Sequence, residues 1–207
     1  PLHARQAVRL LDPAPGEQVL DCCAAPGGKS LYAAGMMEDR GRMVSLDINR
    51  QRVKLISKAA ERLGVSIVDA QTVDATKLPD AFKQAFDRVL VDAPCSGLGV
   101  LSKRADLRWR ISEADLIELG ALQEQLLTEA ASAVRPGGVL VYSTCTIEPE
   151  ENAAQIERFL KENPDFSIDD ASKFVSAEVV SSEGFVSTLP HVHSMDGAFA
   201  VRMLRTA

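Results

Sequence analysis

The chain has 207 residues, of which 46% are hydrophobic and 25% charged, and its formal net charge is −6. These values are typical of one globular domain around a single core, and no apolar run approaches the roughly 18 residues that a membrane span requires. Because phosphate binding needs clustered Lys and Arg, the acidic balance excludes a protein that coats nucleic acid by bulk electrostatics. Any contact with nucleic acid must be local or assisted.

Short apolar, β-branched runs alternate with longer amphipathic stretches, which predicts an α/β fold with a parallel sheet and crossover helices. Five parallel strands are expected, at 18–22, 43–47, 67–73, 88–92 and 139–143. Apolar residues at helical spacing predict helices at 50–63, at 113–134 and from near Pro149 to before Pro164. Shorter β-like pieces follow, ending with 198–204, and these predict extra edge strands.

The cysteines are spread along the chain without a C-x-x-C pair, as Cys22, Cys23, Cys95 and Cys145. This spacing, with an N-terminus that lacks a signal-peptide pattern, predicts a cytoplasmic protein without disulfides or a structural metal. We expect Cys22 to be buried as a small apolar residue. Because the first residue is Pro1 and not Met, we expect residues 1–207 to be one domain of a longer chain with an RNA-binding region upstream.

A turn of small residues follows the first predicted strand and reads DCCAAPGGKS over 21–30. Such a turn lets the backbone approach a ligand at a helix N-terminus. It is not a P-loop, because that pattern requires glycine where Cys23 stands. It is not the G-x-G-x-x-G fingerprint either, because Gly27 and Gly28 are adjacent and no third glycine follows at the required spacing. These departures exclude the simplest NTPase and dehydrogenase readings.

Acidic residues close the next two predicted strands. Asp47 lies 47 − 28 = 19 residues beyond Gly28, where a carboxylate can accept hydrogen bonds from ribose hydroxyls, so the ligand is expected to contain a nucleoside. Asp74 closes the third strand in the same way. It either lies near the adenine or serves as an ordinary helix N-cap.

Two thiols follow the fourth and fifth strands, in DAPCSG at 92–97 and YSTCT at 142–146. If these strands are neighbours, Cys95 and Cys145 face one crevice beside the nucleoside site. A thiolate that adds to carbon 6 of cytosine makes carbon 5 nucleophilic toward a methyl sulfonium. A helix N-terminus near Pro149 is expected to lower the pKa of Cys145, and Asp92 to protonate or hydrogen-bond N3 of the adduct.

A short basic segment after the Cys95 loop, KRADLRWR at 103–110, contains the single tryptophan. Guanidinium groups bind phosphate and an indole stacks on an unpaired base, so the segment predicts RNA contacts from Arg104, Arg108, Trp109 and Arg110. The alternative is a solvated loop anchored by a buried Trp109. The target cytosine would be unpaired or flipped out of its stack.

The chain resembles the Sun (also called Fmu or RsmB-like) branch of the RNA cytosine-5 methyltransferases over nearly its whole length. The motifs that carry the resemblance are CAAPGGKS at 23–30, DAPCSGLG at 92–99, RWR at 108–110 and YSTCTIEPEEN at 142–152. The opening PLHARQAV lacks the QDEAS-like stretch of the family. Ala198 stands where the terminal DGFF strand of the family has an aromatic, and we expect this change to affect packing only.

The resemblance implies a Rossmann-like class I methyltransferase with a seven-stranded, mostly parallel sheet whose last strand is reversed. It implies that Cys145 is the nucleophile and that Cys95 assists product release. The implied substrate is RNA, ribosomal rather than transfer, methylated by a monomer. The implied S-adenosylmethionine contacts are Cys23, Ala24, Ala25, Pro26, Gly27, Gly28, Lys29, Asp47, Asp74 and Asp92.

Two other hypotheses remain open on the sequence. In one, Cys95 is the nucleophile, as in DNA cytosine-5 methyltransferases, and DNA is the substrate. In the other, the domain binds S-adenosylmethionine or RNA without turnover, because a fold alone does not guarantee activity.

Overall fold

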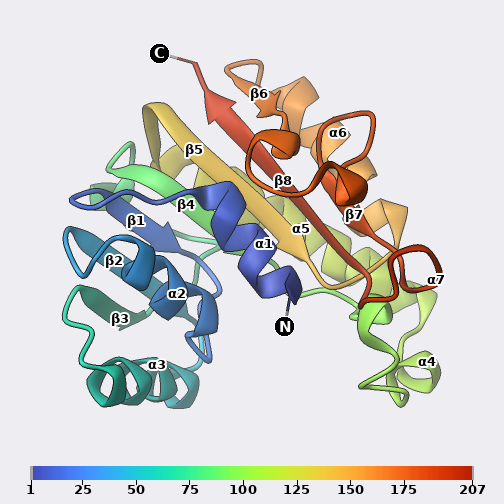
Figure 1. Ribbon diagram of the computed structural model, residues 1–207, viewed down its shortest axis with the longest axis horizontal. Coiled ribbons are helices and arrows are strands. Elements are labelled where there is room, and N and C mark those ends of the chain that lie inside the picture. Colours follow the sequence, from blue (N-terminus) through green and yellow to red (C-terminus); the bar gives the residue numbers. More distant parts are fainter. Residues whose placement is uncertain (1, 207) are drawn as a thin grey trace.

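The computed structural model describes residues 2–206 and places eight strands in one sheet (Figure 1). The strands are β1 Gln18–Asp21, β2 Arg42–Asp47, β3 Val68–Thr72, β4 Phe86–Asp92, β5 Val134–Thr144, β6 Phe166–Asp169, β7 Val186–Thr188 and β8 Ala198–Arg205. The helices are α1 Leu2–Leu11, α2 Gly28–Met36, α3 Arg50–Leu63, α4 Leu107–Arg110, α5 Glu113–Ala133, α6 Ala153–Glu162 and α7 Pro190–His193. Within these residues, no helix has the length and apolar character to cross a membrane.

The strand order is β3-β2-β1-β4-β5-β8-β6, and β7 pairs with β8 beside this path. The first five strands of the path are parallel to one another, whereas β8 runs antiparallel to β5, β6 and β7. The five predicted parallel strands and the reversed last strand are thus confirmed. The path contains the seven expected strands, and the short β7 adds an eighth.

Two elements begin more than two residues away from the predicted start. Strand β5 begins at Val134, directly after α5, so the expected stop at 136–138 lies inside the strand, opposite an irregularity in β4. The helix expected from Pro149 starts as a 3₁₀ turn, Pro149–Glu151, and α6 follows from Ala153. The opening of the chain, which the family pattern left unexplained, forms α1.

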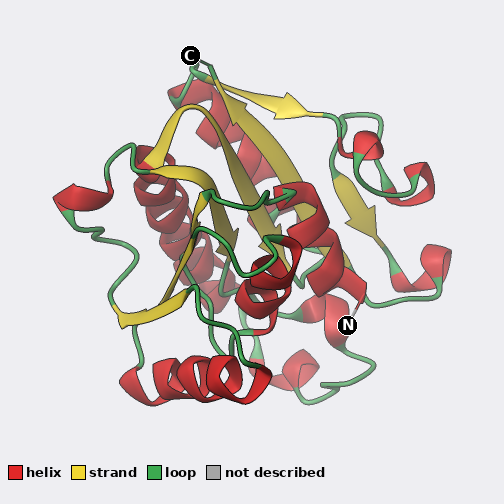
Figure 2. Ribbon diagram, turned by 60° about the vertical axis from the view of Figure 1, so that its left-hand side comes forward, coloured by secondary structure: helices red, strands yellow, loops and turns green. Residues whose placement is uncertain are grey.

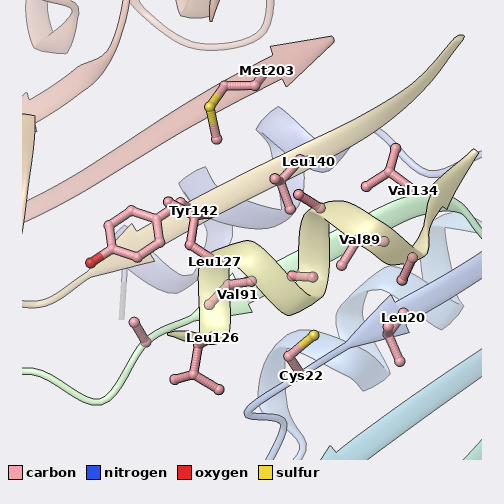
Figure 3. Packing of buried hydrophobic residues seen from close by; sticks show 14 of the residues in the cluster. Leu20, Cys22, Val89, Val91, Leu126, Leu127, Val134, Leu140, Tyr142 and Met203 are labelled. Carbon is pink, nitrogen blue, oxygen red and sulfur yellow. The ribbon is translucent and has the colours of Figure 1, made fainter. Parts of the chain in front are cut away.

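Helices cover both faces of the sheet (Figure 2). Residues of α1 and α2, such as Leu10 and Ala33, pack with Val19 and Val141 in one apolar cluster. The other face packs against α5 and α6 in a larger cluster, part of which Figure 3 shows around Leu127 of α5. Burial on both faces explains why the parallel strands read as continuous apolar runs. Cys22 lies in the larger cluster, 1% exposed, as predicted.

Two arginines of the sheet hold the C-terminal end of α1. Arg88 donates to the carbonyl of Leu11 at 2.6 Å, and Arg202 donates to the carbonyls of Leu10 and Leu11 at 2.5 and 3.1 Å. These bonds satisfy carbonyls that a helix end leaves without partners and place positive charge at the negative end of the helix dipole. Arg202 also pairs with the buried Asp169 at 2.8 Å. The first helix is thereby tied to the last strand.

Arg202→Ala is expected to lower the free energy of unfolding by about 3 kcal/mol, because it leaves the buried Asp169 with Lys173 alone and removes the donor to the carbonyls of Leu10 and Leu11. Arg42→Ala is the control, since Arg42 pairs with Asp69 on the surface and its loss should cost less than about 1 kcal/mol. Urea unfolding followed by circular dichroism measures both. Equal effects of the two substitutions would contradict this account of α1.

Candidate active site

The small-residue turn after β1 leads into the N-terminus of α2. Gly27, the N-cap, has φ +104°, and a Cβ there would lie 3.3 Å from Ile56 of α3, so both conformation and packing require glycine. Within residues 2–206, no side chain caps the first turn of α2. The backbone N–H groups of this turn therefore point, with the positive end of the helix dipole, toward a place suited to an anionic group.

Carboxylates stand at the same edge of the sheet, after β2 and β3. Asp47 is buried, accepts a hydrogen bond from the Asn49 N–H at 2.8 Å and lies 3.1 Å from the Arg52 guanidinium. Asp74 accepts hydrogen bonds from the hydroxyl and the N–H of Thr76, at 2.7 and 3.0 Å, and these bonds lower its pKa. These two hydrogen bonds close a tight turn, and no helix starts after Asp74. The interpretation of Asp74 as a helix N-cap is therefore wrong.

Asp92 joins three elements at the carboxyl end of β4. Its Oδ2 atom lies 2.5 Å from Nζ of Lys29, in the first turn of α2, and its Oδ1 atom accepts a hydrogen bond from the hydroxyl of Ser143, in β5, at 2.8 Å. Sequence reasoning assigned Lys29 to the cofactor and did not single out Ser143. The pairing of β4 with β5 brings Asp92 opposite Ser143, which no local pattern reveals.

The structure brings the two strand-end thiols together, as the sequence predicted. Because β4 and β5 are neighbours, the loops that follow them start side by side. The Sγ atoms of Cys95 and Cys145 are 3.3 Å apart, and the Cys145 N–H donates to Sγ of Cys95 at 3.3 Å. Both residues are partly exposed. This is a hydrogen-bonded pair of thiols open to a ligand.

The two thiols differ in acidity. Burial raises the pKa of Cys22 and Cys23, and the hydrogen bond to Cys145, together with burial, raises that of Cys95. The pKa of Cys145 is lowered, chiefly by its hydrogen bond with Cys95; burial and a nearby carboxylate oppose this effect, and the charge of Lys29 adds to it. Of these four thiols, Cys145 is therefore the one poised to ionise.

The cause of this lowering differs from the one expected. The segment at Pro149 is a three-residue 3₁₀ turn, and α6 begins only at Ala153, so a regular helix end does not face Cys145. A neighbouring thiol takes its place, because a hydrogen bond to the charged form stabilises a thiolate.

Asp21, the last residue of β1, is a buried acid that sequence reasoning missed. Its Oδ2 atom accepts a hydrogen bond from Ser30 at 2.7 Å, and its Oδ1 atom has no partner among the described residues. Burial raises its pKa to about 6. The residue lies directly under the small-residue turn, and an acidic residue at a strand end was the available signal.

The basic segment forms α4 and lies beside the Cys95 loop, at the lower right of Figure 1. Trp109 is 84% exposed, so the alternative of a buried tryptophan anchor is wrong. Leu107 anchors the segment instead, since its side chain packs onto Gly97. Arg104 and Arg110 are exposed and lie 3.8 and 3.4 Å from Asp106. The indole of Trp109 and the guanidinium groups of Arg104 and Arg110 are thus exposed to solvent in the same segment.

A cavity of about 450 Å³ opens next to the two cysteine loops. Gly99 donates to the carbonyl of Cys145 at 3.1 Å, and Gly197 donates to the carbonyl of Gly99 at 2.8 Å, so the start of β8 is tied to both loops. A Cβ on Gly99 would lie 2.2 Å from the Gly197 carbonyl oxygen, which excludes any larger residue. The cavity is lined by Leu98, Gly99, Leu101, Ser102, Ile147, Pro190, His191, Ser194, Met195 and Asp196.

Comparison with known proteins places this arrangement in a family. The model of the family "16S rRNA methyltransferase RsmB/F" matches residues 8–204. The chain is 44% identical over 199 residues to a probable ribosomal RNA small subunit methyltransferase B of Bacillus subtilis, covering 94% of this chain and 44% of the relative. A probable ribosomal RNA small subunit methyltransferase B of Synechocystis is 39% identical over 206 residues, covering 97% and 46%. The chain spans about half the length of the curated relatives it matches.

Solved structures agree. The crystal structure of NSun6 from Pyrococcus horikoshii with SFG has a TM-score of 0.89 and 30% identity, covering all of this chain and 52% of that one. A methyltransferase homologue from the same organism has a TM-score of 0.84 and 29% identity, covering 98% and 66%. Since the family model spans the sheet and both cysteine loops, the chain belongs to the 16S rRNA methyltransferase RsmB/F family.

Proposed function

We propose that this chain is a catalytic domain that transfers a methyl group from S-adenosylmethionine to carbon 5 of a cytosine in RNA. The observation that carries the proposal is the Cys95–Cys145 pair beside Asp92, in which one thiol is acidified by the other. The names of the curated relatives favour ribosomal RNA as the substrate class. The proposal includes action in the cytoplasm and as a monomer.

The turn after β1 fits S-adenosylmethionine. A Cβ at Gly28 would meet no protein atom within 4 Å, so this side of the turn is open, and the first-turn N–H groups of α2 suit the carboxylate of the ligand. Asp47, at the end of β2, suits the ribose hydroxyls, and Asp74, which follows the neighbouring strand β3, is our candidate for the adenine. Bound there, the cofactor would supply an electrophilic methyl group. The ten residues assigned to it from 23–29, 47, 74 and 92 remain a prediction.

The Cys145 thiolate then adds to carbon 6 of the cytosine. The carbon 5–carbon 6 π electrons form a carbon 4–carbon 5 double bond, the carbon 4–N3 π electrons move to N3, which takes up a proton from solvent, and carbon 5 becomes the nucleophilic end of an enamine that takes the methyl group. Asp92, whose charge is balanced by Lys29, accepts a hydrogen bond from the protonated N3. Cys95, kept protonated beside the attacking sulfur, stabilises the thiolate before attack.

Product release reverses the first bond. A water molecule takes the proton of carbon 5, the electron pair of that bond forms the carbon 5–carbon 6 double bond again, Cys145 leaves as a thiolate, and N3 returns its proton to solvent. Cys95 lies within hydrogen-bond distance of the leaving sulfur and assists this elimination. The cytosine must present a face to Cys145, so it is unpaired or flipped. The mechanism calls for no metal, and among the side chains that the structure describes, those of residues 5–206, no group of three or more His, Cys, Asp or Glu is suited to hold one.

The exposed α4 segment supports RNA binding through Arg104, Arg108, Trp109 and Arg110. Trp109→Ala is expected to weaken binding of a looped RNA by about 5- to 150-fold, because a stacked base contributes roughly 1–3 kcal/mol. Ile117→Ala, which removes an exposed apolar side chain from α5, is the control. Fluorescence anisotropy with a labelled hairpin measures both, and unchanged affinity for Trp109→Ala would remove the indole from the RNA site.

Two alternatives lead to different outcomes. A DNA methyltransferase with Cys95 as nucleophile requires Cys95 to ionise first, and its raised pKa disfavours that order. A binding module without turnover would have no need for an acidified thiol at the site.

Methyl transfer from labelled S-adenosylmethionine to total RNA tests the proposal, with the product nucleoside identified by mass spectrometry. We expect label in 5-methylcytidine. Label in another nucleoside, label in DNA alone, or cofactor binding without any transfer would each reject it.

A further inference from the structure

Glu151 is a buried carboxylate for which the mechanism above has no use. It lies in the 3₁₀ turn after the Cys145 loop and has no exposed surface. In the part of the chain that the structure describes, no cation pairs with it. Burying an unpaired charge is costly unless hydrogen bonds replace the lost water. Its partners therefore indicate what the charge is for.

Among the described residues, the side chain of Glu151 accepts hydrogen bonds from Ser96 and Gln123, which both lie outside its own turn. Ser96 donates its N–H to Oε1 at 3.0 Å and its hydroxyl to Oε2 at 2.5 Å. Gln123 of α5 donates to Oε1 at 2.8 Å, and the same Gln123 nitrogen lies 2.9 Å from the carbonyl of Pro94. The carboxylate thus holds the backbone on both sides of Cys95.

The same network reaches the second cysteine loop. The hydroxyls of Ser96 and Thr146 are 2.8 Å apart, and Thr146 follows Cys145 directly. The hydroxyl of Tyr142, in β5, donates to the carbonyl of Glu151 at 2.8 Å and fixes the 3₁₀ turn to the sheet. The residue after Cys95, Ser96, is therefore bound directly to Glu151. The residue after Cys145, Thr146, is bound to the Ser96 hydroxyl that Glu151 holds.

We propose that Glu151 is a positioning residue that clamps the Cys95 loop to the Cys145 loop and so maintains the hydrogen-bonded sulfur pair. The inference rests on the proposed function only in calling Cys145 the nucleophile. The clamp acts through Cys95. Without it the loops keep the backbone bond from Gly99 to the Cys145 carbonyl and the weak sulfur contacts, but Ser96 and Thr146 are no longer fixed beside the two thiols, and the donated S–H that favours the Cys145 thiolate loses its alignment.

Glutamine and alanine at position 151 separate the clamp from the charge. A glutamine oxygen still accepts from the Ser96 N–H and from Gln123, while its NH₂ donates to the Ser96 hydroxyl, which remains free to donate to Thr146. Glu151→Gln is therefore expected to keep the loops together and to lose less than about tenfold in kcat. Glu151→Ala removes every bond and is expected to lower kcat by about 100-fold, the scale of a 1 Å misplacement.

The decisive readout is the pH dependence of Cys145 alkylation by iodoacetamide in the full chain, with each cysteine mapped by mass spectrometry. We expect Glu151→Ala to move the Cys145 profile to higher pH and Glu151→Gln to leave it near that of the natural chain. The same pair of substitutions in a Cys95→Ala background should produce no further shift, because the donor through which Glu151 acts is already missing. Glu150→Ala, an exposed neighbouring carboxylate, is the matched control.

Ser96→Ala covers the case in which Glu151→Ala does not fold. It removes the hydroxyl that joins Glu151 to Thr146 but keeps the Ser96 N–H bond, so a smaller shift in the same direction is expected. An unshifted profile in the folded variants, or an equal shift with and without Cys95, would overturn the proposal. Alkylation requires neither RNA nor S-adenosylmethionine, so this result is separate from whether the chain methylates cytosine.

Discussion

Cys145→Ala is expected to abolish methyl transfer, lowering kcat by at least about 10⁴-fold, and to leave no covalent protein–RNA adduct. The physical reason is that carbon 5 of cytosine is not nucleophilic until a thiolate has added to carbon 6, and no other thiol in the site is acidified. The measurement is single-turnover transfer from labelled S-adenosylmethionine, with adducts resolved on denaturing gels.

Cys95→Ala is the matched comparison, because it removes the other sulfur of the same pair. We expect it to form the adduct and to release it slowly, so that adduct accumulates while turnover falls. It should also shift the pH profile of activity upward, since the pKa of Cys145 loses its main lowering influence. If Cys95→Ala instead removes the adduct and Cys145→Ala retains it, the roles of the two cysteines are reversed.

Asp92→Asn is expected to lower kcat by about 10²- to 10⁴-fold, the range for a group that manages a proton in the transition state. The substitution keeps the shape of the side chain but leaves Lys29 without its counter-charge and N3 of the adduct without an anionic acceptor. Asp69→Asn is the control, since Asp69 is an acidic residue of the same sheet whose Arg42 pair is exposed. Initial rates at saturating cofactor and RNA measure the effect.

Asp92→Asn should also change the pKa of Cys145, and the direction of that change makes the test specific. The charge of Asp92 raises the pKa of Cys145, so its removal should increase the thiolate fraction at neutral pH. If the thiolate fraction alone limited the rate, Asp92→Asn would be at least as active as the natural chain. A loss of activity accompanied by faster alkylation of Cys145 would therefore locate the defect at the cytosine ring, and a loss of less than about tenfold would remove Asp92 from the proton chemistry.

Local patterns in the sequence were sufficient for most elements of the fold. The five parallel strands are apolar on both faces and the helices after them are amphipathic, so their signals do not depend on distant residues. The errors occur where tertiary contacts override a local signal. Pro136 and two glycines indicated a stop, yet β5 runs through them, because the strand pairs with β4 at Val134 before them and from Val139 after them, with an irregularity between. The sequence left open whether Trp109 is buried or exposed, because the burial of a side chain depends on which distant segments pack over it.

The sequence by itself determined the α/β class, the ligand turn at 21–30 and the two thiols at strand ends, because residue type and spacing along the chain decide these. Only the tertiary structure decided that Cys95 is the neighbour that acidifies Cys145, that Lys29 and Ser143 hold Asp92, and that Glu151 is buried across both loops. Each of these findings depends on a contact between residues that are 50 or more positions apart in the sequence. Such distances depend on which strands pair and in which register, and no pattern within one segment contains that information.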